Sequence, residues 1–330
     1  MAADRIILGG APEGYDARLL LRELEKGRPV LHVARDDKRA EAMRAALSVF
    51  APGLAVLDFP AWDCLPYDRV SPNPEICSRR MATLAALAEG LSGAFVVLST
   101  LNAVTQRIPA RDVVRASSFR AVVGDRVDEA RLKAFLSRMG FSPVSTVAEP
   151  GDYAIRGGIV DIYPPGPGGP VRLDFFGDVL DSARRFDAET QRTVEKLKSV
   201  DFAPVSEVVL DEAGITRFRQ NYRVEFGAAG TDDPLYEAVS AGRKHQGMEH
   251  WLPFFHDRLE TIFDYLPDAS VMLDDQVTPM RLARWEGIDD AHDARAEALT
   301  AKGRMDTVYK PVAPGLLYLD DAGWECEIGV

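Results

Sequence analysis

Residues 153–187, YAIRGGIVDIYPPGPGGPVRLDFFGDVLDSARRFD, decide the fold of this chain. The composition of this stretch predicts three short strands joined by two turns. Residues 153–163 are rich in β-forming side chains, and the pair Gly157–Gly158 predicts either a bulge or a close approach between two backbones. Residues 164–170 hold four prolines and three glycines, so neither a helix nor a strand continues through them.

Strand alternation then assigns two faces to residues 171–176. One face carries Val171, Leu173 and Phe175, and the other carries Arg172, Asp174 and Phe176. A hairpin closed around residues 167–168 also brings Arg156 towards the same end. An aromatic ring with arginines on the open face of a small sheet is the usual composition of a protein-binding hot spot. The alternative is that a helix covers Phe176 and that the arginines only flank it.

Outside this stretch, the chain predicts a doubly wound α/β layer. Amphipathic helical patterns at 38–50 and 78–89 alternate with short apolar runs. Because such runs are typical of strands buried in a parallel sheet, they predict strands at 5–8, 29–34, 54–59, 95–98 and 270–273.

The alternation of strands and helices pauses at Ser118 and partly resumes after Pro204. Residues 118–204 are therefore predicted to form a small α+β domain inserted into a larger α/β domain. That larger domain is assigned residues 1–117 and 205–315. Residues 316–330 carry no clear pattern and are predicted to be a tail or linker.

A strand, a glycine loop and a helix open the chain, which is the context of a phosphate-binding P-loop. Gly9 and Gly14 keep the P-loop spacing, but Tyr15 and Asp16 stand where a working loop has Lys and Ser or Thr. A carboxylate repels a triphosphate, and a tyrosine cannot neutralise one. The strand at 270–273 ends in Asp274-Asp275, like a Walker-B site, but helix capping is the better interpretation without the lysine. We expect no nucleotide site.

No arrangement for catalysis or metal binding is evident. Cys64, Cys77 and Cys326 lack CxxC spacing and a histidine partner, which is typical of reduced thiols in a cytosolic protein. His250 and His256 are separated by a proline and lack ligand spacing. No apolar run of about 20 residues predicts a membrane helix. The expectation is a cytoplasmic protein with no membrane partner, no cofactor and no catalytic residues.

The formal net charge of −12 disfavours sequence-independent DNA binding, which needs a dense basic surface. The charge is uneven, because residues 118–204 contain 12 basic and 13 acidic residues. The inserted domain is thus nearly neutral within an acidic chain. It is the part best suited to meet an acidic or mixed partner surface.

Several segments carry a family resemblance: RGGIVDIYP, RLDFFGD and RRFDAETQRT, and upstream FPAWDCLPYDRVSPNPEICSRRMATLAAL at 59–87. The first three resemble both the excision-repair protein UvrB and the UvrB-like region of the bacterial transcription-repair coupling factors (Mfd). The upstream segment resembles the coupling factors far more closely. The likeness covers essentially the whole chain in the same order, and it implies a degenerate, helicase-like UvrB fold.

The resemblance also implies a function. In this family the UvrB-like region recruits UvrA, and Arg156, Arg172 and Phe176 match the positions of its UvrA-contacting residues. The family's ATP- and Mg²⁺-dependent motor and its contacts with RNA polymerase and DNA are expected in parts outside this chain. The segment at 60–74 has too few residues to form the damage-probing hairpin of UvrB. The alternative is a weak or vestigial nucleotide- or DNA-binding module.

Overall fold

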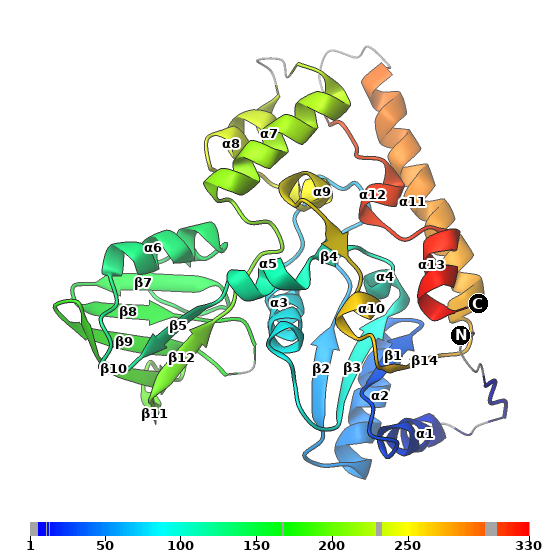
Figure 1. Ribbon diagram of the computed structural model, residues 1–330, viewed down its shortest axis with the longest axis horizontal. Helices are drawn as coiled ribbons and strands as arrows, with labels where there is room; N and C mark the ends of the chain where they lie inside the picture. The colour runs from blue at the N-terminus through cyan, green and yellow to red at the C-terminus, as the bar shows by residue number, and fades with distance from the viewer. Residues whose placement is uncertain are drawn as a thin grey trace. The chain divides into compact units, whose positions relative to one another are not determined.

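The computed structural model describes residues 6–10, 12, 14–166, 168–228, 233–300 and 309–329. The chain divides into two compact units, and Figure 1 labels most of their helices and strands. The first unit comprises Met1–Asp68, Gly90–Ile108 and Leu259–Val330, and the second comprises Arg69–Glu89 and Pro109–Arg258. These units are divided at positions other than 118 and 204. The domain boundaries that the sequence places at 118 and 204 therefore stay a prediction.

A four-stranded parallel sheet forms the centre of the first unit, in the order β14-β1-β3-β2. Its strands are β1 (Val30–Ala34), β2 (Ala55–Phe59), β3 (Phe95–Thr100) and β14 (Ser270–Leu273). β1 and β3 are buried along their whole length, as expected of central parallel strands. The predicted α/β class with a parallel sheet is confirmed.

Two helices cover a face of this sheet: α1 (Tyr15–Leu24) and α2 (Asp37–Phe50). Leu20 of α1 and Leu47 of α2 are completely buried, and both belong to a core cluster that also contains Val30 of β1. The apolar stripe of each helix therefore fixes it on the sheet. The remaining elements of this unit are α4 (Leu101–Val104), β13 (Leu259–Glu260), α10 (Ile262–Tyr265), α11 (Val277–Thr300), α12 (Pro314–Leu317) and α13 (Asp321–Ile328).

Two findings at the ends of the chain differ from the pattern read in the sequence. The strand predicted at 5–8 is wrong for the described part, because residues 6–8 form no strand and Ile7 is 81% exposed. Within 316–330, for which the sequence predicts a tail or linker, α13 is a helix capped by Asp320. Its Trp324 is buried and packs edge-on against Phe263, with ring centroids 6.1 Å apart.

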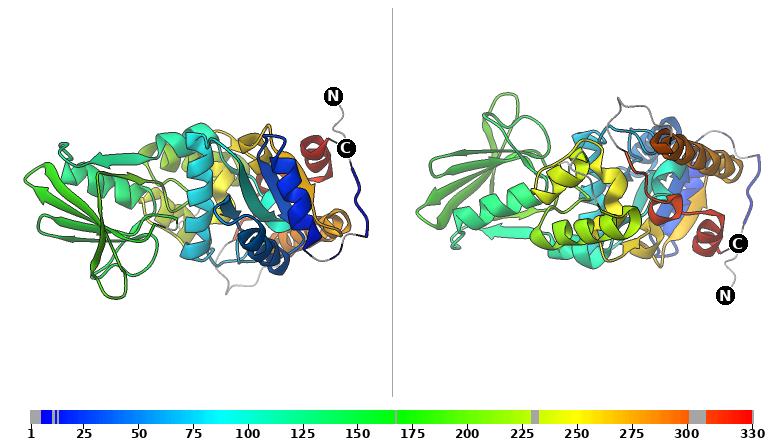
Figure 2. Two further views of the ribbon diagram at one scale, coloured as in Figure 1. Left: turned by 90° about the horizontal axis from the view of Figure 1, so that it is seen from below. Right: turned by 90° about the horizontal axis from the view of Figure 1, so that it is seen from above.

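The second unit contains a six-stranded sheet, drawn in green in Figures 1 and 2. Its order is β11-β10-β9-β8-β7-β6, and every pair except β6–β7 is antiparallel. The strands are β6 (Ser142–Pro143), β7 (Asp152–Arg156), β8 (Ile159–Ile162), β9 (Val171–Phe176), β10 (Val179–Phe186) and β11 (Thr193–Leu197). A separate antiparallel pair joins β5 (Phe119–Val122) and β12 (Ser199–Phe202).

A single core cluster joins α6 (Glu129–Arg138) to the inner face of this sheet. Leu132 and Leu136 of the helix and Val160, Leu173 and Leu180 of the strands are all completely buried in it. Asp128 caps the start of the helix, and its carboxylate accepts hydrogen bonds from the backbone of the first turn. Polar residues of the strands are thereby left on the opposite, outer face.

The single strand predicted over 153–163 is wrong, because the chain forms a hairpin there. β7 and β8 are joined by the two residues Gly157 and Gly158, and Gly157 has a φ of 61° that favours glycine. The alternative of a close backbone approach is confirmed. A Cβ on Gly158 would lie 2.8 Å from the carbonyl oxygen of Phe175, so only glycine fits at this position.

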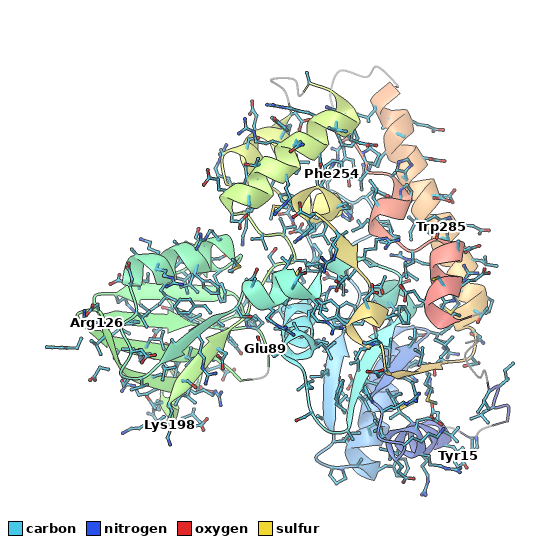
Figure 3. All side chains as sticks on the ribbon, in the orientation of Figure 1. Tyr15, Glu89, Arg126, Lys198, Phe254 and Trp285 are labelled. Atoms are coloured by element: carbon cyan, nitrogen blue, oxygen red, sulfur yellow. The ribbon has the colours of Figure 1, made fainter. Side chains whose placement is uncertain are left out.

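The second unit is completed by helices outside the sheet. They are α3 (Pro74–Glu89), α5 (Arg111–Ala116), α7 (Glu212–Phe226), α8 (Pro234–Ser240), the 3-10 helix η1 (Met248–Trp251) and α9 (Leu252–Phe255). The short strand β4 (Ile108–Pro109) precedes α5. Phe254 of α9, labelled in Figure 3, packs among the rings of Phe218 and Tyr222 of α7. The segment between His250 and His256 therefore packs against α7.

Among the described residues, no helix combines the length and apolar character needed to cross a bilayer. The same residues hold no group of three or more His, Cys, Asp or Glu side chains placed to bind a metal ion.

Candidate protein-binding site

Strand β9 presents its two faces as the alternation predicts. Val171 and Leu173 are buried in the core cluster, and the partly buried Phe175 packs against it. Phe176, the next residue, is 84% exposed. The alternative in which a helix covers Phe176 is wrong for the described part of the chain. The ring of Phe176 is thus open to solvent at the end of a strand whose other apolar side chains pack against the core.

Arg156 and Arg172 come together on the outer face, and a third residue, Asp161, joins them. Asp161 lies opposite Arg172 in the pairing of β8 with β9, and its side chain is completely buried. Its carboxylate accepts hydrogen bonds from Nε and Nη2 of Arg172, at 2.6 and 2.8 Å, and from Nη2 of Arg156, at 2.5 Å. The hydrogen bond with Asp161 raises the pKa of the Arg172 guanidinium.

A small second cluster lies on the outer face itself, where Ala154 pairs with Asp161. It consists of Val147, Ala154 and Phe186, with Val144 and Tyr163 packed against it. The guanidinium carbon of Arg172 lies 4.8 Å from the centroid of the Phe186 ring, which adds a cation–π contact to the ion pair. Arg172 is therefore held from two sides and keeps only 22% of its side chain exposed, whereas Arg156 keeps 51%.

The next row of the outer face is also paired. Asp174 accepts a hydrogen bond from Ser182 Oγ at 2.8 Å and a second one from Arg184. Phe176 stands one row further along the same face of β9. The structure therefore groups the three predicted contact residues on one face of the sheet, with Arg156 and Arg172 in direct contact with one carboxylate.

The sequence interpretation missed Asp161, although a signal was present. Asp161 interrupts an apolar strand between Val160 and Ile162, so strand alternation places it on the outer face with Arg172. An acidic residue on that face, opposite an arginine, is a candidate for a cross-strand ion pair. The pairing register was needed to recognise it.

The glycine loop leads into helix α1. Gly14 has a φ of 80° and precedes the helix without providing a side-chain cap. Tyr15 is 42% exposed. Asp16 accepts a hydrogen bond from the backbone nitrogen of Ala17 at 2.9 Å and another from the guanidinium of Arg39. Gly9 is exposed and forms no strand or helix. That Gly9, Gly14, Tyr15 and Asp16 bind no nucleotide stays a prediction.

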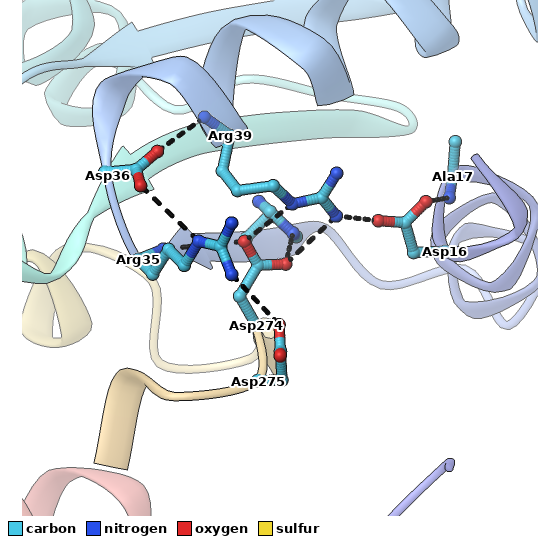
Figure 4. Close-up of polar contacts among 8 residues, drawn as sticks. Asp16, Ala17, Arg35, Asp36, Arg39, Asp274 and Asp275 are labelled. Carbon is cyan, nitrogen blue, oxygen red and sulfur yellow. Dashed lines mark hydrogen bonds and ion pairs between the residues drawn. The ribbon is translucent and has the colours of Figure 1, made fainter. Parts of the chain in front are cut away.

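Arg39 of α2 links two acidic residues that are distant in the sequence (Figure 4). Besides Asp16 it contacts Asp274, with 3.1 Å between Nε and Oδ2. His32 of β1 also approaches Asp274, with 3.3 Å between its Nε2 and Oδ1. Burial opposes ionisation of Asp274, but His32 and Arg39 outweigh it and lower the pKa of its carboxyl group to about 2. The carboxylate that resembles a Walker-B residue is thus already neutralised by Arg39.

We expect Asp274 to stabilise this unit in a pH-dependent way. Its pKa falls from an ordinary 3.8 to about 2 on folding, so its contribution is complete above pH 4 and is lost as the pH falls towards 2. The contribution is about 2 kcal/mol. Urea unfolding of the unchanged chain and of Asp274→Asn at several pH values measures it. Asp275→Asn, at a side chain that is 76% exposed, is the control. Identical acid slopes in the unchanged chain and in Asp274→Asn would contradict this interpretation.

Comparisons with known proteins identify the family of the chain. Residues 119–207, which include β5 to β12, match the family described as the UvrB interaction domain. The chain is 35% identical to the transcription-repair-coupling factor of Myxococcus xanthus in an alignment 325 positions long, which covers 92% of the chain and 26% of that relative. It is 33% identical to that of Haemophilus influenzae and 32% identical to that of Escherichia coli, each over 82% of the chain and 24% of the relative.

The fold and the match over residues 119–207 thus define a class, the UvrB-like α/β proteins with an interaction domain of the UvrB type. Within that class, the chain belongs to the transcription-repair coupling factor family and corresponds to its amino-terminal UvrB-homology region. It spans about a quarter of the length of the curated relatives it matches.

Proposed function

We propose that this chain is a binding module that recruits UvrA through the outer face of its antiparallel sheet. The contact surface consists of Phe176, Arg156 and Arg172. One observation carries the proposal: Phe176 is 84% exposed on the same face as two arginines that a buried carboxylate holds in place. Since an aromatic ring beside arginines is the composition of interface hot spots, this face is the strongest candidate in the interaction domain.

The arginines can still contact a partner although both are paired with Asp161. Within the described residues, Nη1 of Arg172 and Nε and Nη1 of Arg156 make no hydrogen bond. These donors can bind carboxylate oxygens on UvrA, while Phe176 enters an apolar pocket. Removing one such arginine weakens the contact and also leaves Asp161 with fewer donors.

The other functions of the family are proposed for parts of a longer protein. We infer that ATP-driven translocation and the contacts with RNA polymerase and DNA belong to those parts, and that this chain uses no ATP or Mg²⁺ of its own. The proposal that the chain is not an enzyme has two supports. Asp16 stands at a position that a P-loop gives to Ser or Thr, and Asp274 is neutralised by Arg39.

We expect the chain neither to bind nor to hydrolyse ATP. A triphosphate at the loop would find no P-loop lysine, and the nearby guanidinium of Arg39 is already engaged by Asp16 and Asp274. Calorimetric titration of the 330-residue chain with Mg-ATP should therefore give no heat of binding at micromolar concentrations. Micromolar binding that a Gly14→Ala substitution abolishes would contradict the proposal and favour a nucleotide-binding module.

A further inference from the structure

We propose that Asp161 is a positioning residue for partner binding, which holds Arg156 and Arg172 in the geometry that the partner requires. The inference rests on the proposed function, because it concerns the same contact surface. It adds a residue that does not itself reach the partner, since its side chain is completely buried.

The three side chains meet at one carboxylate. Asp161 lies on β8, between the strands that carry the two arginines, and it uses both of its oxygens. Oδ1 accepts from Nε of Arg172, while Oδ2 accepts from Nη2 of Arg172 and Nη2 of Arg156. The sharing of Oδ2 brings the two guanidinium groups to one oxygen atom.

Asp161 also acts through its charge. Two guanidinium groups beside each other repel, and the buried carboxylate between them removes most of that repulsion. The group of three carries one net positive charge instead of two. Without Asp161, we expect Arg156 to leave the sheet for solvent, because its only hydrogen bond within the described residues goes to this carboxylate.

The fixed orientation of the two arginines lowers the cost of binding a partner. Fixing a long side chain at an interface costs free energy, and a side chain that is already fixed in the free protein avoids that cost. Asp161 fixes two arginines before the partner arrives. Asp161→Asn keeps the size of the side chain but removes its charge, so both arginines lose their fixed orientation. We expect this substitution to weaken UvrA binding about tenfold.

Asp161 could instead act only on the stability of the fold, and a set of four proteins separates the two roles. The set contains the unchanged chain, Asp161→Asn, the double variant Arg156→Ala with Arg172→Ala, and the triple variant that combines them. UvrA affinity and the temperature of unfolding are measured for each. If Asp161 acts through the arginines, the triple variant binds UvrA as the double variant does. It also unfolds at a higher temperature, because the double variant leaves a buried carboxylate unpaired.

A readout without the partner tests the positioning itself. In the unchanged chain, the Nε–H of Arg172 is bound to a buried carboxylate and should give a slowly exchanging NMR signal. Asp161→Asn should lose this signal. Asp201→Asn is the matched control, because Asp201 pairs with Arg120 at an exposed position of β12. It should keep both the signal and the affinity.

The outcomes distinguish this inference from the proposed function. If the double arginine variant binds UvrA as the unchanged chain does, the proposed function fails and the inference fails with it. If the double variant loses binding but Asp161→Asn binds normally, the inference alone is overturned. A triple variant that binds about tenfold more weakly than the double variant also overturns it, because Asp161 would then act without the arginines.

Discussion

Phe176→Ala should weaken the binding of UvrA to this chain about thirtyfold or more, with no change in its unfolding. The ring is 84% exposed, so its removal opens no cavity in the fold. At a protein interface, the loss of an aromatic anchor typically costs roughly 2 kcal/mol or more, which corresponds to this change in affinity. Calorimetry or surface plasmon resonance with purified UvrA measures the affinity, and thermal unfolding measures the stability.

Two control variants make this prediction specific. Val194→Ala removes an apolar side chain of β11 that is 69% exposed, and it should leave UvrA binding unchanged. Phe175→Ala removes the neighbouring ring, which packs against the core, and should destabilise the domain by about 3 kcal/mol. If Phe176→Ala lowers the stability and Phe175→Ala lowers only the affinity, the two faces of β9 have been assigned the wrong way round.

Either Arg80→Ala or Glu207→Ala should destabilise the second unit by about 3–5 kcal/mol. Arg80 of α3 and Glu207, which follows β12 in the chain, form an ion pair with 2.5 Å between Nε and Oε1. Their side chains are 0% and 1% exposed. Removing one partner leaves a charge in a site that water does not reach, and this penalty exceeds the strength of the contact itself. Urea unfolding monitored by circular dichroism measures the change.

The double variant Arg80→Met with Glu207→Leu tests that reason. It removes both charges and fills the space with apolar atoms, so it should be less destabilised than either single variant. Asp112→Ala is the control, because Asp112 pairs with Arg258 at the surface, with side chains 65% and 59% exposed. It should change the stability by less than about 1 kcal/mol. Equal effects at the buried and exposed pairs would contradict this account.

The sequence was sufficient for the features that depend on local pattern. The alternation of β9 separates Phe176 from Phe175, and the structure confirms both faces. The apolar runs of the first unit identify its four parallel strands. Each of these features depends on residues close together in the chain, whose spacing is visible in the sequence.

Features that depend on contacts between distant residues could not be predicted in the same way. Asp161 meets Arg172 only because β8 and β9 pair in one particular register. Arg39 contacts both Asp16 and Asp274, which lie 23 and 235 residues away from it in the chain. The apolar residues 6–8 have the composition of a strand, but they form none. In that case tertiary pairing, and not propensity, decides the outcome.

Hydrogen exchange of the 330-residue chain with and without purified UvrA tests the central claim most directly. The account predicts a stable complex, with slower exchange of backbone amides around Arg156 and around Phe176. It predicts no change in α7 or in the parallel sheet of the first unit. The absence of a complex, or protection confined to α7 or the first unit, would contradict the claim that this outer face recruits UvrA.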